Sequence, residues 1–365
     1  SQALAKLEGD LGGALFQRRR QGVFLTDRGA VFAGRVGRAM ARLDMALAQV
    51  SPRLIVTATA AQMRALMAMA ETQNFTLAAR ALGLAQPSVH RAITQIEQDA
   101  GTALFDRRSF GMVATRPALR LAQAARLAFA ELEQAKADLA EFDGRDGGRV
   151  VVGALPLARS VVLPEALARF HAARPRARVT VFDGAYDEML AGLRRGDIDL
   201  ILGALRDPAP IDDVVQEPLF ADRLACLAKP GHPLAGMTDI SLATLAKQAW
   251  VVPRQGVPAR AQFDALFRDH GLPVPEPVLE CGSILLMREL LHRGDLVGCI
   301  SAQQAEAEIA RGLLARLDTG IDWPDRAIGL TYRADWVPTG AQTALLTMIR
   351  AAAKSGGGSQ NGRPA

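Results

Sequence analysis

Apolar residues recur along two long stretches of the chain at steps that alternate between four and three positions. In the first stretch they are Phe32, Val36, Ala39, Leu43, Ala46 and Val50. In the second they are Leu121, Ala125, Ala128, Leu132, Ala135 and Leu139. A period of 3.5 residues predicts an α-helix with one apolar seam, which is the pattern of helices that pair along their length.

The two stretches occupy equivalent places in a repeated unit whose copies are offset by 89 residues. Residues 7–19 (LEGDLGGALFQRR) resemble residues 96–108 (IEQDAGTALFDRR). Between 1–30 and 90–119, eleven residue types recur without a gap: Ala3, Glu8, Asp10, Gly12, Ala14, Leu15, Phe16, Arg18, Arg19, Gly22 and Thr26. This pattern indicates a duplicated domain, since the repeats of a solenoid are shorter and more numerous.

The second copy carries the pattern of three consecutive helices. One helix is predicted over 62–71 and a short one over 77–82. Gly83 supplies a turn, and Pro87 suits the first turn of a third helix. The predicted buried faces are Met63, Leu66, Met67 and Ala70 in the first helix and Val89, Ala92, Ile93 and Ile96 in the third. This order predicts a helix-turn-helix, although the pattern alone fits a small helical bundle about equally well.

Polar side chains of the third helix and of the segment after it suit contact with a nucleic acid. Ser88, Arg91 and Gln95 share its outer face, and such groups hydrogen-bond base edges and phosphates. The Arg107-Arg108 pair lies in a predicted hairpin that follows. Because the guanidinium fork matches phosphate oxygens, we expect this hairpin to lie as a wing against a DNA backbone.

From residue 149 onward strands and helices alternate. Strands are predicted over 149–155, 179–183 and 198–205, with helices over 163–174 and 186–195 between them. This βαβαβ order implies a parallel sheet. The further elements expected are strands over 224–228, 250–252, 296–300 and 328–332, and helices over 259–270, 284–292 and about 339–352. A glycine-rich hinge, DGRDGG at 143–148, marks the boundary with the first half.

Charge and composition narrow the class of protein. Residues 1–142 hold 18 Lys and Arg against 12 Asp and Glu, whereas the remainder holds 25 against 26. A basic excess at one end suggests a nucleic-acid-binding part joined to a neutral one, although a solvated basic face gives the same count. No apolar run approaches the ~18 residues of a membrane helix, so we expect no membrane partner. The three dispersed cysteines point to a reducing cytoplasm and against a disulfide framework.

Enzyme signatures are absent from the sequence. It contains no GxSxG, P-loop, GxGxxG, HxxxH or CxxC pattern. We therefore expect no catalytic residues, no metal site and no cofactor.

The segment FTLAARALGLAQPSVHRAITQIEQDAGTALFDRR at 75–108 resembles the winged helix-turn-helix of LysR-type transcriptional regulators. The matching residues are Phe75, Ala78-Ala79, Leu82, Leu84, Gln86-Pro87-Ser88, Ile93, Ile96-Glu97, Gly101, Leu104-Phe105 and Arg107. The resemblance extends to about residue 350. It includes a subgroup with two such units in tandem, to which regulators of sugar-binding-protein genes, such as the galactose-binding-protein regulator group, belong.

The resemblance implies the function of a ligand-responsive DNA-binding transcription factor. It assigns DNA contacts to Gln86, Pro87, Ser88, His90, Arg91, Gln95, Arg107 and Arg108. Two departures stand out. Ala85 replaces a capping Ser or Thr, which weakens the helix start by about 1 kcal/mol. His90 replaces the usual Ser, so we expect a different base preference.

The fold class implied is an N-terminal winged helix-turn-helix, one partial and one complete copy, plus a periplasmic-binding-protein-like two-lobe α/β effector domain. We expect the first copy and its helix over 1–50, the complete copy over 58–117, a linker helix over 118–142 and the effector domain over 148–353. Lobe one comprises 149–206 and 328–353, lobe two comprises 212–318, and 354–365 is a disordered tail. Because Ser1 aligns with His90, inside the recognition helix, we expect the first copy to be truncated, and we hypothesise that it does not bind DNA.

The linker helix has two interpretations. The resemblance implies that helix 118–142 pairs two subunits, and we favour this reading, which makes the protein a homodimer or homotetramer. With two seam-bearing helices in one chain, they can instead pack on each other.

Ligands of such α/β lobes bind at the carboxyl ends of the strands. At the family's effector positions, this chain places Ser160, Gly184, Arg206, Pro253, Arg254, Gln255 and Ser283. Together with Arg159, the arginines suit an acidic ligand, and the subgroup suggests a sugar, so we expect a sugar or small carboxylate as partner beside double-stranded DNA. The alternative is a solute-binding protein or enzyme that uses the two-lobe domain alone.

Overall fold

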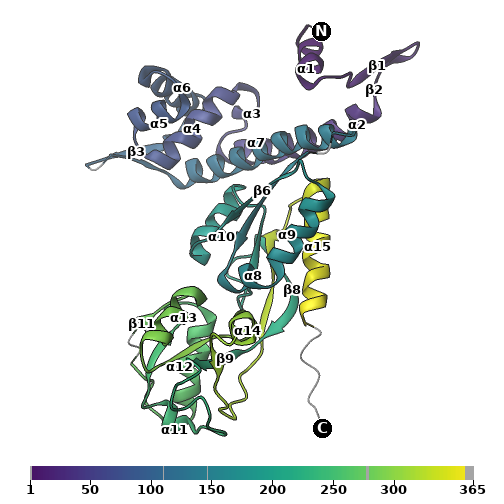
Figure 1. Ribbon diagram of the computed structural model, residues 1–365. Coiled ribbons are helices and arrows are strands. Elements are labelled where there is room, and N and C mark those ends of the chain that lie inside the picture. The colour runs from purple at the N-terminus through teal and green to yellow at the C-terminus, as the bar shows by residue number, and fades with distance from the viewer. Residues whose placement is uncertain (1, 110, 146, 277–278, 358–365) are drawn as a thin grey trace.

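The computed structural model describes residues 2–109, 111–145, 147–276 and 279–357. A layer of helices from the first half of the chain lies across one end of the molecule, and two α/β lobes follow below it (Figure 1). The predicted fold class, a winged helix-turn-helix plus a two-lobe α/β domain, is confirmed.

The second copy folds as three helices and a hairpin. Its elements are α4 (Ala60–Thr72), α5 (Phe75–Leu82), α6 (Gln86–Ala100), β3 (Phe105–Arg108) and β4 (Gly111–Ala114). Thr59 and Gln62 form a reciprocal capping box at the start of α4, and Asn74 accepts hydrogen bonds from two backbone amides of α5. Gly83 ends α5 in the left-handed region, with φ of 66°, which turns the chain into α6.

The first copy repeats the end of this arrangement. It comprises α1 (Gln2–Leu11), β1 (Phe16–Arg19), β2 (Gly22–Leu25) and α2 (Asp27–Val50), and a short α3 (Leu54–Thr57) leads into the second copy. Its hairpin has the same register as the hairpin of the second copy, with Phe16 opposite Leu25 as Phe105 is opposite Ala114.

Helix α2 packs along α7 (Arg116–Phe142) in antiparallel orientation (Figure 1). Arg28 near the start of α2 bonds Asp143 just beyond the end of α7, whereas Leu47 near the end of α2 shares a core with Leu121 near the start of α7. The seam residues Ala125, Ala128, Ala135 and Leu139 of α7 are buried. The prediction that we favour from the sequence pairs α7 with a second chain. In the structure α2 of the same chain covers α7, which is the other arrangement that the sequence allowed.

Lobe one is a five-stranded sheet with the order β6-β5-β7-β14-β8. Strands β5 (Arg149–Ala154), β6 (Arg178–Phe182) and β7 (Leu200–Ala204) are parallel, and β14 (Arg326–Arg333) runs antiparallel to β7 and β8 (Val214–Asp222). Alternate residues of β5 face opposite layers: Val150 and Val152 pack with α9 (Val162–Ala173) and α15 (Gly340–Gly357), and Val151 packs with α10 (Tyr186–Arg195).

Lobe two is a second five-stranded sheet with the order β11-β10-β12-β9-β13. Its strands are β9 (Leu224–Ala228), β10 (Ala249–Val252), β11 (Leu279–Glu280), β12 (Leu296–Ser301) and β13 (Ala315–Arg316). Its helices are α11 (Leu242–Leu245), α12 (Pro258–Asp269), α13 (Ile284–Arg293) and α14 (Ala302–Ala310). Trp250, Phe263 and Phe267 form an aromatic cluster between the sheet and α12.

Three expectations about boundaries need correction. Residues 214–222, which we assigned to lobe two, form β8 of the lobe-one sheet, because β8 pairs with β14 over its whole length. Pro156–Ser160, which lies between the predicted strand 149–155 and the predicted helix 163–174, forms the short helix α8. Helix α15 continues to Gly357, past residue 354 where we expected a tail. The rest of that tail, residues 358–365, lies outside the described residues.

Two crossovers join the lobes, and charged side chains hold them together. The carboxylate of Asp222, at the first crossover, is fully buried, pairs with Arg326 of the second and accepts a hydrogen bond from Ser301 Oγ at 2.8 Å. The guanidinium of Arg223 reaches Asp322 at 2.7 Å and Asp325 at 2.5 Å. Among the residues that the structure describes, no helix is both long and apolar enough to cross a bilayer.

Candidate nucleic-acid interface and ligand cleft

Helix α6 presents opposite faces to the core and to solvent. Val89, Ile93 and Ile96 are buried against α4 and α5, as predicted. On the other face Gln86, Pro87, His90, Arg91 and Gln95 are exposed, and Ser88 is half-buried. The side chains expected to contact DNA are therefore available on one surface of the helix.

Two of these side chains already have local partners. The His90 ring packs on Phe75 with 5.0 Å between ring centroids, and its Nδ1 lies 3.4 Å from Thr94 Oγ1. Gln95 Nε2 donates to Asp99 at 3.3 Å. Arg91 takes part in no ion pair within the described chain, which leaves its guanidinium available to a base or a phosphate.

The start of α6 has no side-chain cap, as the alanine at position 85 predicted. Uncapped amides at a helix N-terminus carry partial positive charge and bind phosphate oxygens. A phosphate that took the place of the missing cap would compensate for the loss expected from Ala85.

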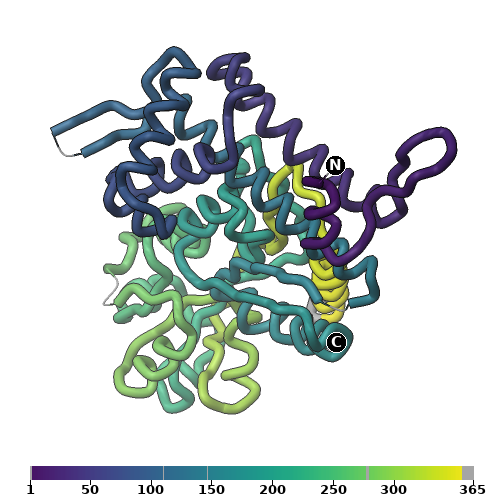
Figure 2. Tube along the Cα trace, turned by 90° about the horizontal axis from the view of Figure 1, so that it is seen from above, coloured from purple at the N-terminus to yellow at the C-terminus, as the bar shows by residue number. Residues whose placement is uncertain are grey.

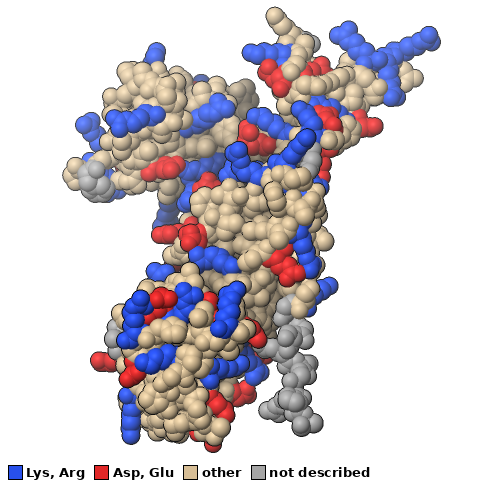
Figure 3. All heavy atoms as spheres, in the orientation of Figure 1, with Lys and Arg blue, Asp and Glu red and all other residues tan. Residues whose placement is uncertain are grey.

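The β3–β4 hairpin is fixed to α6 by one carboxylate. Glu97 Oε1 accepts hydrogen bonds from Leu104 N at 2.8 Å and Phe105 N at 3.0 Å, so the hairpin leaves the core at a set angle. Arg107 and Arg108 lie exposed on it, and Arg108 pairs weakly with Asp106 at 3.6 Å. Figure 3 shows basic side chains on this unit and again on the β1–β2 hairpin.

The predicted ligand residues of lobe one follow its parallel strands. Ser160 ends α8 after β5, Gly184 follows β6 and Arg206 follows β7, and Ser160 and Gly184 are exposed. The Arg206 guanidinium stacks on the Tyr186 ring at 4.3 Å, and its backbone N–H and C=O both bond the Gln216 side-chain amide. Burial lowers the pKa of Arg206 and raises that of Tyr186.

Tyr186 is a candidate ligand residue that the sequence pattern does not single out. Its side chain is buried, and its hydroxyl is among the buried polar atoms that lack a hydrogen-bond partner in the described structure. Its place directly after the Asp183-Gly184 turn, at a strand's carboxyl end, was the signal available. A buried hydroxyl without a partner, beside a half-buried guanidinium, is available to form a hydrogen bond with a polar ligand.

The predicted ligand residues of lobe two lie in two loops that the sheet brings together. Strands β10 and β11 are parallel, with Val252 opposite Glu280, so Pro253 and Cys281 begin neighbouring loops. Arg254 and Gln255 are exposed, Pro253 is buried, and Ser283 caps α13 through Leu286 N at 3.4 Å. Arg260 ties the loops together by donating to Pro253 O at 3.3 Å and to Glu280.

Arg159 already has a partner, since it pairs with Asp183 at 2.7 Å. The lobes touch where α8 packs on α14. The predicted ligand residues do not line either of the two cavities described for the structure.

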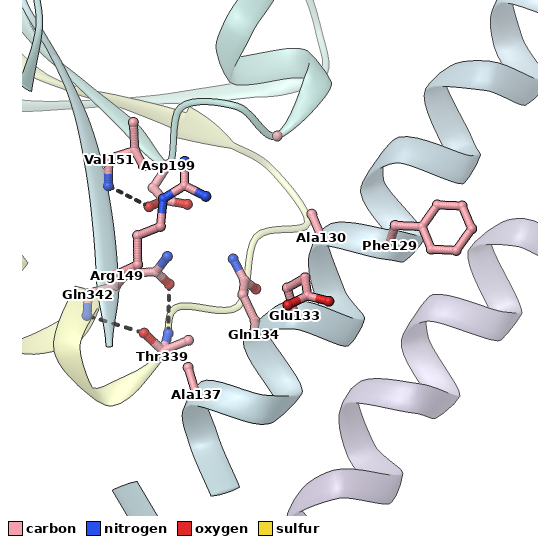
Figure 4. Close-up of a pocket in the computed structure, with 11 residues that line it drawn as sticks. Phe129, Ala130, Glu133, Gln134, Ala137, Arg149, Val151, Asp199, Thr339 and Gln342 are labelled. Carbon is pink, nitrogen blue, oxygen red and sulfur yellow. Dashed lines mark hydrogen bonds between the residues drawn. The ribbon is translucent and has the colours of Figure 1, made fainter. Parts of the chain in front are cut away.

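One cavity, of about 250 Å³, lies between α7 and lobe one. Figure 4 shows Glu133 and Gln134 of α7 across from Arg149 and Asp199 of lobe one, with Thr339 and Gln342 bonded to each other beside them. Asp199 accepts a hydrogen bond from Val151 N at 2.7 Å, and burial raises the pKa of its carboxyl. The cavity therefore lies where lobe one meets the linker helix.

Two protein families match the chain. Residues 60–119 match the family described as "Bacterial regulatory helix-turn-helix protein, lysR family", and residues 143–354 match "LysR substrate binding domain". The HTH-type transcriptional regulator GalR of Pseudomonas putida is 37% identical over 355 residues, 96% of this chain and 89% of that protein. CbbR of Rhizobium meliloti is 32% identical over 296 residues, 80% of this chain and 92% of that protein.

Solved structures share the fold. Full-length OxyR C199D from Pseudomonas aeruginosa superposes with a TM-score of 0.57 at 21% identity, covering 80% of this chain and 97% of that one. CbnR, a LysR family transcriptional regulator, gives a TM-score of 0.54 at 20% identity, with 81% and 99% covered.

Proposed function

The chain belongs to the LysR family of bacterial transcriptional regulators, and on this basis we propose that α6 and the β3–β4 wing contact DNA. We propose further that a ligand held between the lobes controls this binding. The protein is a DNA-binding transcription factor with an effector-binding domain, and its relatives are named as regulators rather than enzymes. The alternative, a free solute-binding protein or enzyme, is not favoured.

The observation that carries the DNA-contact proposal is the separation of the two faces of α6. Val89, Ile93 and Ile96 hold the helix in the core, so Gln86, Ser88, Arg91 and Gln95 share one rigid surface. Such a surface supports our proposal that α6 enters a major groove. We assign base contacts to Arg91 and Gln95, backbone contacts to the α6 start, and phosphate contacts to Arg107 and Arg108.

The test is binding to the DNA upstream of the regulator's own coding sequence, measured by fluorescence anisotropy at several salt concentrations. Arg107→Ala together with Arg108→Ala should reduce the slope of log K against log salt by about 1–2, since each phosphate contact contributes about 0.9. Arg91→Ala should also weaken the preference for the operator over unrelated DNA. Arg176→Ala, at an exposed position of the effector domain, is the matched control. Absence of salt-sensitive binding by the unaltered protein contradicts the proposal.

For the effector we propose a sugar or a small carboxylate that bridges the lobes. We assign its contacts in lobe one to Arg206, the Tyr186 hydroxyl, Ser160 and Gly184, and its contacts in lobe two to the Pro253–Gln255 loop and Ser283. The support is that the Tyr186 hydroxyl is buried without a partner beside the Arg206 guanidinium, and that the parallel strands β10 and β11 bring the two lobe-two loops together. A thermal-shift screen of sugars and small carboxylates tests this class. A ligand at 100 times its Kd stabilises the folded state by about 2.7 kcal/mol, whereas a flat response to both classes contradicts it.

We further propose that chains associate as homodimers or homotetramers in the cytoplasm through surfaces other than the seam of α7. The support is that α2 already covers this seam within the chain. Sedimentation of the full chain with and without DNA measures the oligomeric state.

A further inference from the structure

We propose that residues 2–50 form a second DNA-contacting unit, so that one chain carries both units of a two-site DNA reader. This inference rests on the proposed function, because it assumes that the second copy binds DNA. It reverses the hypothesis, drawn from the sequence alone, that the first copy does not bind DNA.

The first support is an equivalence between the copies at the level of hydrogen bonds. Glu8 Oε1 accepts from Leu15 N at 2.8 Å and Phe16 N at 3.0 Å, which are the same distances as those from Glu97 to its hairpin. Thr26 caps α2 and donates its N–H to Leu15 O at 2.9 Å, as Thr115 does to Leu104 O before α7. The first hairpin therefore leaves its helices at the angle of the DNA-contacting one.

The second support is the charge of the first hairpin, whose tip carries Arg18, Arg19 and Arg20, all exposed. Figure 3 shows basic side chains gathered on this hairpin. These three arginines take part in no ion pair within the part of the chain that the structure describes. Gln17 stands where the second hairpin has Asp106, so the first hairpin lacks the acid that partly neutralises the second. On α1, exposed Lys6 occupies the position equivalent to Gln95.

The third support is the placement of the two units. The antiparallel packing of α2 on α7 relates equivalent helices by an approximate two-fold rotation, and the two hairpins point away from each other at its ends (Figure 2). Helix α2 has 24 residues, so the pair is about 36 Å long. The pair therefore holds the two units apart at its opposite ends, so that each can contact a different segment of one duplex.

The connection between the copies favours pairing within one chain. Val50 ends α2 and Ala60 begins α4, and Leu54 between them is fully buried in the core of the second copy. Because this connecting segment is short and anchored, it keeps α2 at a high effective concentration beside α7. The α2 helix of a separate chain at micromolar concentration competes poorly for the same surface.

The decisive experiment compares two pairs of charge reversals by hydroxyl-radical footprinting on the upstream DNA. Arg18→Glu with Arg19→Glu should remove protection from one flank and leave the other, and Arg107→Glu with Arg108→Glu should do the opposite. Arg176→Glu with Arg311→Glu, both exposed on the effector domain, is the control for the same change in net charge.

A first-hairpin variant whose footprint and affinity equal those of the control overturns the inference while leaving the proposed function intact. If the second-hairpin variant also equals the control, the proposed function itself fails. We expect the first-hairpin variant to bind at least tenfold more weakly at low salt, with the difference shrinking as salt rises, because screening weakens phosphate contacts.

Cross-linking tests whether both units come from one chain. Arg38 lies 3.4 Å from Glu131, and Arg35, one turn earlier, lies 2.9 Å from Gln134. Arg38→Cys with Gln134→Cys, treated with a flexible bis-maleimide, should give a closed loop at single-chain mass. The native cysteines are buried and do not compete. A product of double mass overturns intrachain pairing, and Arg38→Cys alone controls for chance collisions.

Discussion

Arg28, the second residue of α2, forms two parallel hydrogen bonds with Asp143, the first residue after α7. Nε donates to Oδ1 at 2.9 Å and Nη2 donates to Oδ2 at 3.1 Å, and Arg28 also holds Leu11 O and Gly13 O of the first copy. A bidentate arginine–carboxylate pair fixes both distance and orientation. This contact therefore locks the first copy to the point where the linker helix enters the effector domain.

Replacing Arg28 should release the first copy without unfolding the rest. Arg28→Met removes the bonds to Asp143, Leu11 and Gly13 together, so amides of residues 11–26 should exchange with deuterium faster, while those of α4–α6 stay protected. Arg145→Met is the matched control, because Arg145 also bonds Asp143, at 2.7 Å, without reaching the first copy. Equal exchange in both variants would show that Arg28 does not hold this segment.

The same contact predicts a dependence on pH. The hydrogen bond from Arg28 holds the pKa of the Asp143 carboxyl below its ordinary value of 3.8. A lowered folded-state pKa means that the stabilisation is present above the ordinary value and is lost as the pH falls through the lowered one. In the unaltered protein, the protection of the amides of residues 11–26, measured relative to their intrinsic exchange rate at each pH, should therefore fall at acid pH. In Asp143→Asn the protection should already be lowered at neutral pH and lose this acid step. An acid step that survives in the variant would assign it to another group.

Arg35 should be among the most sensitive positions of the linker layer. Its buried guanidinium donates to Asp138 at 2.7 Å, to Gln134 at 2.9 Å and to Val337 O at 2.6 Å, and it lies 3.3 Å from Glu131, whose carboxylate is also buried. Arg35→Met leaves the buried Glu131 carboxylate without its buried partner. The free energy of unfolding, measured by urea denaturation, should fall by about 3–5 kcal/mol.

Arg38 provides the comparison for Arg35. It also reaches Glu131, at 3.4 Å, but its side chain is 40% exposed. Arg38→Met should lower the free energy of unfolding by less than about 1 kcal/mol. Comparable losses in the two variants would mean that burial does not set the strength of this cluster.

Tyr186→Phe should separate ligand binding from stability. The Tyr186 hydroxyl is buried without a partner, so its removal should leave the melting temperature unchanged or raise it. If the hydroxyl bonds the effector, affinity for a ligand found by the screen should fall about 3- to 10-fold by calorimetry. Tyr332→Phe is the control, since that hydroxyl bonds Glu217 at 3.3 Å. Undiminished affinity in Tyr186→Phe would remove Tyr186 from the ligand site.

The DNA-binding half illustrates what local pattern can predict. The faces of α6, the Gly83 turn and the hairpin arginines all follow from periodicity and turn chemistry, because each depends on residues within about one helical turn of its neighbours. The structure changes little there beyond extending α4 and α5 by one or two residues.

The effector half shows where local pattern stops. The residues of β8 by themselves do not show which lobe the strand belongs to. Its backbone pairing with β14, over a hundred residues later in the chain, assigns it to lobe one. The Arg206–Tyr186 stack joins residues that follow different strands, so neither residue alone marks the other as a partner.

The amino-acid order by itself determined the helix-turn-helix and the two seams, because each depends on short-range spacing. It also determined the duplication, because the same residue types recur at an offset of 89 residues. It left open which seam meets which, because an apolar stripe buries equally well against any matching stripe. Packing in three dimensions resolved this choice through contacts that spacing does not encode. Arg28 and Arg35 find their carboxylates on α7 of the same chain, and this pairing is what places two hairpins on one molecule.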